Sequence, residues 1–223
     1  MLYSSAYHEK GRIFYDSGKY DKALQMFDKE IELNPYSSDA YRSKGLALSL
    51  LGKFEEAIDS FDKAIKFDPK NIDAYFKKGF ALFRLGKYQD TIELCDRVIE
   101  LDPMHSEAYY NKASALSKLG KYQASVDSYN KSIELNPSDD GAYFNKGMSL
   151  FDLGKYQEAI RAYDKAIFLS PQNPLAYYYK SSCLYNLKRY QEALKVCEQL
   201  IDINPKSLNA YELKILILKK LKS

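Results

Sequence analysis

The sequence has no tryptophan and, in 223 residues, only two histidines and three cysteines. His8 and His105 are far apart in the sequence, so we do not expect them to share a site. The cysteines, Cys95, Cys183 and Cys197, lack the paired spacing of a zinc or redox motif. Gly-rich phosphate loops and the HExxH and GxSxG patterns are also missing. We therefore predict a protein that is not an enzyme, has no metal site and no cofactor, and keeps its thiols reduced and buried.

Long hydrophobic runs and a strong charge of one sign are also lacking. No apolar segment approaches the roughly 18 residues of a membrane-spanning helix. The chain has 33 Lys and Arg against 30 Asp and Glu, dispersed along its length, so neither nucleic acid nor membrane insertion is expected. Residues 1–10 show no basic segment followed by an apolar run. We expect a cytoplasmic protein.

What the sequence does contain is a repeat of 34 residues. A tyrosine recurs at the fourth position of each unit, a lysine at the seventh and a small residue at the eighth, and a Gly recurs at the fifteenth in five units. Six prolines keep the same spacing: Pro35, Pro69, Pro103, Pro137, Pro171 and Pro205. The period predicts units at 4–37, 38–71, 72–105, 106–139, 140–173 and 174–207, with a further helix over 208–221.

Each unit is predicted to form two amphipathic helices, because its apolar positions recur with three- and four-residue spacing. The Gly at the fifteenth position supplies a left-handed residue after the first helix, and the Pro cannot continue the second. Asn173 and Pro174 predict a capped helix start. Lys188 stands where the other units have Gly, and a left-handed backbone there is expected to cost about 1 kcal/mol.

These features closely resemble the tetratricopeptide repeat (TPR) family, whose 34-residue helix-turn-helix unit has small and aromatic residues at fixed positions. The second unit shows the resemblance best, with Tyr41, Gly45, Leu48, Phe54, Ala57, Phe61, Ala64 and Pro69. The resemblance covers residues 4–207. Departures include Thr91 and Ser125 at one Ala position, Cys95 and Cys197 at an aromatic position, and Glu30, Val98, Ser132 and Leu200 at another Ala position.

The resemblance implies an all-α fold, a right-handed α-solenoid of antiparallel helix pairs that forms one domain over residues 1–223. It also implies that the first helices line a concave groove, where a partner protein or peptide binds. Carried onto this chain, the groove residues are Arg42, Phe76, Lys77, Phe80, Phe83, Arg84, Tyr110, Asn111, Lys118, Phe144, Asn145, Met148, Phe151, Tyr178, Tyr179 and Tyr185.

Two of these residues point most directly to a ligand. Phe80 and Met148 occupy the ninth position, which is commonly polar in the family, and an exposed apolar side chain there gains little in a monomer. The aromatic residues at the fifth and twelfth positions are ordinary in the family and also serve to pack adjacent helices. The recurring lysine at the seventh position is expected to pack its stem and to extend its ammonium to solvent or to a neighbouring acid.

We therefore expect a non-catalytic scaffold that holds an extended or helical segment of a partner in its groove. The alternative is a self-assembling protein that oligomerises through the helix over 208–221. Ile215, Leu216, Ile217 and Leu218 are consecutive apolar residues, and a helix turns such a run through all its faces, so Ile215 and Leu218 are candidates for self-association. A native chain that continues past Ser223 would also explain this run.

Overall fold

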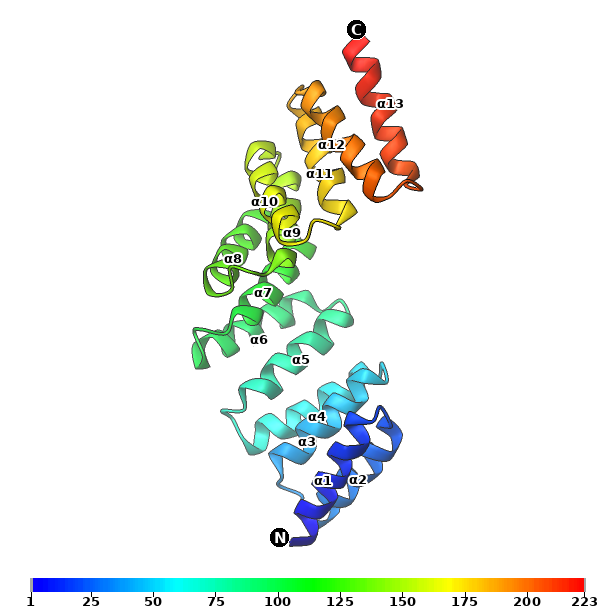
Figure 1. The fold of residues 1–223 in the computed structure, drawn as a ribbon. Coiled ribbons are helices and arrows are strands. Elements are labelled where there is room, and N and C mark those ends of the chain that lie inside the picture. The colour runs from blue at the N-terminus through cyan, green and yellow to red at the C-terminus, as the bar shows by residue number, and fades with distance from the viewer. Residues whose placement is uncertain (1, 223) are drawn as a thin grey trace. The chain divides into compact units, whose positions relative to one another are not determined.

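The computed structural model describes residues 2–222, which contain thirteen helices and no strand (Figure 1). The helices are α1 (Leu2–Asp16), α2 (Tyr20–Leu33), α3 (Ser38–Leu50), α4 (Phe54–Phe67), α5 (Ile72–Arg84), α6 (Tyr88–Leu101), α7 (Ser106–Lys118), α8 (Tyr122–Leu135), α9 (Asp140–Asp152), α10 (Tyr156–Leu169), α11 (Pro174–Asn186), α12 (Tyr190–Ile203) and α13 (Leu208–Lys222). Odd-numbered helices are the first helices of the repeats, and even-numbered helices are the second. The predicted all-α class is confirmed.

The first helix of each of the six full repeats ends in the same turn. In the second repeat, Lys53 N–H donates to the Leu48 carbonyl at 2.9 Å and Gly52 N–H donates to the Ser49 carbonyl at 3.1 Å, which together form a Schellman motif. Gly52 has φ +76°, and Lys188 adopts φ 59° at the equivalent turn of the sixth repeat. The predicted left-handed lysine is therefore confirmed.

Side-chain caps start most of the first helices. Ser37 and Asn71 accept hydrogen bonds from backbone N–H groups in the first turns of α3 and α5. Asn173 caps α11 by accepting from Leu175 N–H at 3.1 Å, with Pro174 in the first turn, as the sequence predicts. The short loops therefore fix where each helix pair begins and ends.

Helices pack mainly on their neighbours in sequence, which makes the fold an α-solenoid. The contacts form two compact units that divide within α7, between Ala115 and Leu116. The single domain expected from the repeats remains a prediction. Both units repeat the same pairing, as with α3 and α4 in the first unit and α9 and α10 in the second.

Within each unit, first helices also contact first helices: α1 with α3 and α3 with α5 in one unit, α9 with α11 and α11 with α13 in the other. Among the described residues of either unit, no two second helices make comparable contacts. The first helices thus approach one another more closely, and this curves each unit with its first helices on the inner side.

In four of the six repeats, the core between the two helices is built around one large side chain on the second helix. Phe27, Phe61, Tyr129 and Tyr163 occupy this position and are almost fully buried. In residues 2–222 the buried Ser132 Oγ and the Tyr163 hydroxyl have no hydrogen-bond partner, but several other polar residues at core positions find partners nearby. The buried Thr91 hydroxyl, for example, donates to the Lys87 carbonyl at 3.0 Å and contacts the Gly79 carbonyl at 3.3 Å, so this departure from the family pattern leaves the fold intact.

Candidate functional site

The predicted groove residues lie on first helices α3, α5, α7, α9 and α11, the inner side of each unit. The first unit carries Arg42, Phe76, Lys77, Phe80, Phe83, Arg84, Tyr110 and Asn111. The second unit carries Lys118, Phe144, Asn145, Met148, Phe151, Tyr178, Tyr179 and Tyr185. Their surroundings differ between the two units.

In the first unit, Phe80 on α5 is the most exposed of the predicted aromatic residues. Its side chain keeps 41% of its surface accessible. The Arg84 guanidinium, one turn later, lies 5.9 Å from the Phe80 ring centroid and 4.8 Å from that of Phe54. These distances suit cation–π contacts. The surface therefore combines an accessible apolar ring with a nearby positive charge.

Three further predicted residues in this unit already have partners. Arg42 donates to Asp73 Oδ2 at 2.9 Å, which ties α3 to α5. Phe76 packs its ring against His105, with centroids 4.7 Å apart, and Lys77 Nζ lies 5.3 Å from the Phe76 ring. An acidic ligand at Arg42 would have to compete with Asp73, so the arginine is placed chiefly to join neighbouring repeats.

In the second unit, the predicted aromatic residues pack largely against the core. Tyr179 is the centre of this cluster, with ring centroids 5.4 Å from Tyr178, 5.8 Å from Phe151 and 6.0 Å from Phe144. Met148, Phe151, Tyr178 and Tyr185 also lie against the buried cluster. Met148 is only half-buried rather than exposed. The ninth position thus presents an open apolar surface at Phe80, while Met148 mainly fills space between helices.

The other predicted residues vary in exposure. Lys118 is exposed at the end of α7, whereas Tyr110, Asn111 and Asn145 are half-buried. On α13, Ile215 and Leu216 are 53% and 48% exposed, while Ile217 is fully buried and Leu218 is half-buried. The four-residue apolar run is therefore split between a packed face and an open face, and Ile215 lies on the open one.

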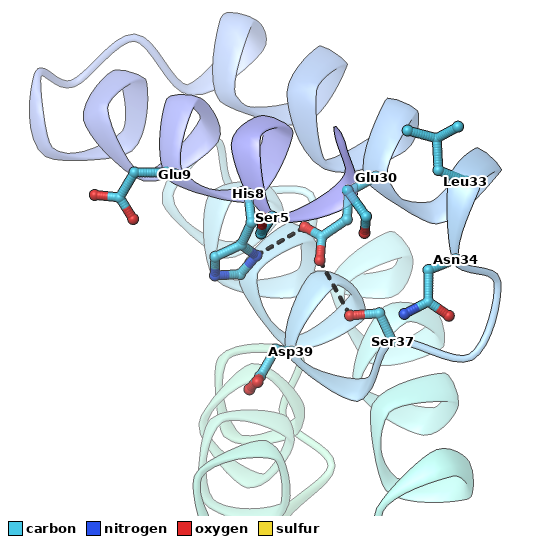
Figure 2. A pocket seen from close by; sticks show the side chains of 9 residues that line it. Ser5, His8, Glu9, Glu30, Leu33, Asn34, Ser37 and Asp39 are labelled. Carbon is cyan, nitrogen blue, oxygen red and sulfur yellow. Dashed lines mark hydrogen bonds and ion pairs between the residues drawn. The ribbon is translucent and has the colours of Figure 1, made fainter. Parts of the chain in front are cut away.

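Sequence reasoning missed an open cleft of about 710 Å³ between α1, α2 and the start of α3 (Figure 2). In Figure 2, Glu30 lies between His8 and Ser37. His8 Nδ1 is 2.7 Å from Glu30 Oε2, and the Ser37 hydroxyl donates to Glu30 Oε1 at 3.1 Å. Glu30 is only 5% exposed. The signal in the sequence was an acid at a position where the family has Ala.

The order of these groups decides what they can do. The imidazole and the Ser37 hydroxyl both contact the Glu30 carboxylate and not each other, so the three groups lack the Ser–His–acid order of a hydrolase triad. Ser37 Oγ also accepts from Ala40 N–H at 3.2 Å as the cap of α3. The hydrogen bond to Glu30 raises the pKa of His8 above its ordinary value, against the opposing effect of burial. The arrangement joins three helices.

The cysteines and the possible metal ligands also offer no reactive site among residues 2–222. The three cysteines are free and buried, as predicted, and burial raises the pKa of Cys95 and of Cys183 to about 12. Such thiols remain protonated at neutral pH and are poor nucleophiles. Among residues 2–222, no group of three or more His, Cys, Asp or Glu side chains is arranged to hold a metal ion. In the same range no helix is both long and apolar enough to cross a bilayer.

Family models match most of the chain. Models described as tetratricopeptide repeat match residues 4–37 and 144–207, and one described as TPR repeat matches residues 45–86. A model described as anaphase-promoting complex, cyclosome, subunit 3 matches residues 88–166. No curated protein matches the sequence.

Solved structures of repeat proteins share the fold. MamA is 28% identical with a TM-score of 0.72, and the match covers 76% of this chain and 92% of MamA. YrrB, described as a TPR protein with an unusual peptide-binding site, is 24% identical with a TM-score of 0.75, over 84% of this chain and 97% of YrrB. PilF of Pseudomonas aeruginosa is 19% identical with a TM-score of 0.79, over 96% and 98%. The repeat period, the paired helices and these matches agree: the chain belongs to the tetratricopeptide repeat family.

Proposed function

We propose that this chain is a non-catalytic scaffold that holds an extended or helical segment of a partner protein against its first helices. Membership of the TPR family, whose fold is typically a non-catalytic scaffold, supports the general role. YrrB and MamA are similar in fold, and the peptide-binding site described for YrrB supports the choice of a peptide as ligand. The surface of α5 supports binding of this peptide by the first helices.

The observation that carries the proposal is the exposed Phe80 beside Arg84. A fully buried phenylalanine side chain stabilises a complex by about 1.5–3 kcal/mol before the costs of ordering are subtracted. Because Phe80 is 41% exposed, covering it recovers part of that energy. Arg84 next to it offers a charge to a carboxylate or a carbonyl of the ligand. An apolar side chain next to an acidic or polar group is the ligand chemistry that fits.

A peptide selection followed by affinity measurement tests this proposal. Peptides are selected from a displayed library on the full chain, and their Kd values are measured by fluorescence anisotropy. Phe80→Asp should weaken binding at least tenfold, since it replaces the ring with a charge at the centre of the proposed surface. Phe168→Asp is the matched control, because Phe168 is an exposed phenylalanine on the second helix α10. Equal affinity of both variants and the wild type would contradict the proposal.

A second function, self-assembly through α13, is favoured by the open face of that helix. Ile215 and Leu216 are about half exposed next to the buried Ile217, so a second copy would cover apolar surface there. Light scattering with size-exclusion chromatography over a hundredfold concentration range measures the mass. Self-assembly predicts a mass that rises with concentration in the wild type and in Ile13→Glu, an exposed isoleucine on α1, but not in Ile215→Glu. A constant monomer mass contradicts it.

A further inference from the structure

Five of the recurring lysines at the seventh position form the same ion pair with a neighbouring acid. Each joins a first helix to the second helix of the preceding repeat, 16 residues earlier, with Nζ to carboxylate oxygen distances from 2.5 to 2.9 Å. The pairs are Lys44 with Asp28, Lys78 with Asp62, Lys112 with Asp96, Lys180 with Asp164, and Lys214 with Glu198.

Lys146 on α9 is the exception. The residue 16 positions earlier is Asn130, which carries no charge, and in residues 2–222 Lys146 makes no ion pair within 4.0 Å. The side chain is half-buried all the same. Burial lowers the pKa of Lys146, and the positive charge of Arg161 lowers it further, although Glu158 opposes both effects. The fifth repeat therefore keeps a partly desolvated ammonium without the acid that neutralises its equivalents.

A second change in the same place adds positive charge. The position of Arg161 on the second helix is acidic in the three preceding repeats, where it is Asp59, Glu93 and Asp127. Arg161 and Lys165, one turn apart on α10, line a cleft of about 230 Å³ together with Lys146. Glu158 is the one acidic residue in the lining. Lys146 therefore lacks two acidic neighbours found in other repeats, because Asn130 and Arg161 stand at their positions.

We propose that the cleft between α9 and α10 binds an oxyanion through Lys146, Arg161 and Lys165. A planar guanidinium and two ammonium groups suit a carboxylate or a phosphate, and 230 Å³ is room enough for either group. The source is the acidic side chain of a bound protein segment or a phosphate group. Because the cleft contains residues of a second helix, this proposal does not depend on the surface around Phe80.

NMR of the full chain labelled with ¹³Cε-lysine tests the proposal at constant ionic strength. Inorganic phosphate and a capped triglutamate peptide are titrated separately, and Lys146→Arg assigns the signal. The Lys146 signal should shift saturably with at least one anion, and the pKa of Lys146 should rise on binding. Saturation with phosphate alone identifies phosphate as the source, and saturation with the peptide alone identifies a carboxylate.

Variants separate a built site from general attraction to a basic surface. Asn130→Asp restores the acid of the other repeats and should weaken anion binding at least tenfold. Asn136→Asp adds the same charge to the same repeat at a position where Asp68 and Asp102 occur in others, and it should leave binding nearly unchanged. The proposal fails if no anion gives a saturable shift, or if both variants respond like the wild type.

The site can also be rebuilt in the third repeat. Asp62→Asn together with Glu93→Arg copies both changes around Lys78, with Arg97 at the position of Lys165. Lys78 should then acquire the saturable response, while Asp62→Asn alone, which keeps Glu93, should not. A Lys78 that responds equally in both variants would contradict the need for the second change.

Discussion

In the first, second and fifth repeats, the aromatic ring on the second helix leaves no room for a Cβ on the glycine opposite it on the first helix. A Cβ added to Gly45 would lie 2.6 Å from the Phe61 ring, and one added to Gly147 would lie 2.6 Å from the Tyr163 ring. At Gly79 the nearest atom is Leu94 Cβ at 3.6 Å, because the aromatic position of that repeat holds Cys95. The same recurring glycine is therefore required in some repeats and only permitted in another.

This difference predicts opposite effects for one substitution. Gly79→Ala should stabilise the chain by about 0.5–1 kcal/mol, because Ala loses less backbone entropy in a helix and meets no close neighbour. Gly45→Ala should destabilise by roughly 1–3 kcal/mol, because Phe61 must move. Urea denaturation monitored by circular dichroism measures both. A loss of stability in Gly79→Ala similar to that in Gly45→Ala would show that the space beside Cys95 is not available.

At the residue scale, the sequence has a small residue at the eighth position of every repeat, and in the structure Gly11, Gly45 and Gly147 lie directly against the aromatic ring of the second helix. Gly45 and Gly79 look equivalent in the sequence, since both recur in the same position. Only their partners, 16 residues further on, distinguish them. The recurring glycine therefore shows that the repeats share a small residue at this position, but it does not show in which repeats a larger residue would clash.

At the element scale, one buried acid joins three helices. Glu30 on α2 contacts His8 on α1 at 2.7 Å and accepts from Ser37, which caps α3, at 3.1 Å. Asp39 adds to the negative surroundings of the imidazole, and Arg12 opposes them. The position is filled by Ala, Val, Ser or Leu in the other repeats, so this junction is specific to the first repeat.

The junction predicts a pH-dependent stability. The pKa of His8 is raised in the folded chain above its ordinary value of 6.5, so protonation favours folding. That contribution is fully present below about pH 6.5 and is lost as the pH rises through the raised folded value. The wild type should therefore exceed His8→Gln in stability more at pH 5.5 than at pH 8.5, as measured by urea denaturation.

A background without the acid provides the control. In Glu30→Ala, the further change His8→Gln should produce no difference that varies between the two pH values. A difference between wild type and His8→Gln that grows with pH would contradict the assignment of the effect to this ion pair.

At the scale of the whole molecule, stability is distributed over neighbouring helices. Within each of two compact units, helices contact their sequence neighbours or the next first helix. In such an array, the free energy of unfolding is approximately a sum of repeat and interface terms. A local defect should therefore stay local.

Hydrogen exchange checks this expectation. Gly45→Ala should accelerate exchange at least tenfold in α3 and α4, with little change in α11 and α12, because these regions belong to different compact units. Gly147→Ala, which meets Tyr163 in the same way, should accelerate α9 and α10 instead. Acceleration of the whole chain by either variant would instead show all-or-none unfolding.

The sequence by itself determined the class of fold and the place of each turn. Helix periodicity, caps, glycines and prolines act within a few residues, so their pattern predicts local hydrogen bonding, and the 34-residue period repeats it along the chain. The sequence shows that Asn130, and not an acid, stands 16 residues before Lys146. Only the ion pairs of the other repeats show that this acid is the partner of the lysine.

The tertiary structure alone decided which candidate residues are accessible. Phe80 and Met148 share one position in the repeat, yet Phe80 is exposed and Met148 packs against the buried cluster of the second unit. Arg42 is a groove candidate in the sequence, but in the structure its guanidinium pairs with Asp73 at 2.9 Å. The physical reason is that exposure and pairing depend on side chains from neighbouring helices, which a local pattern does not place.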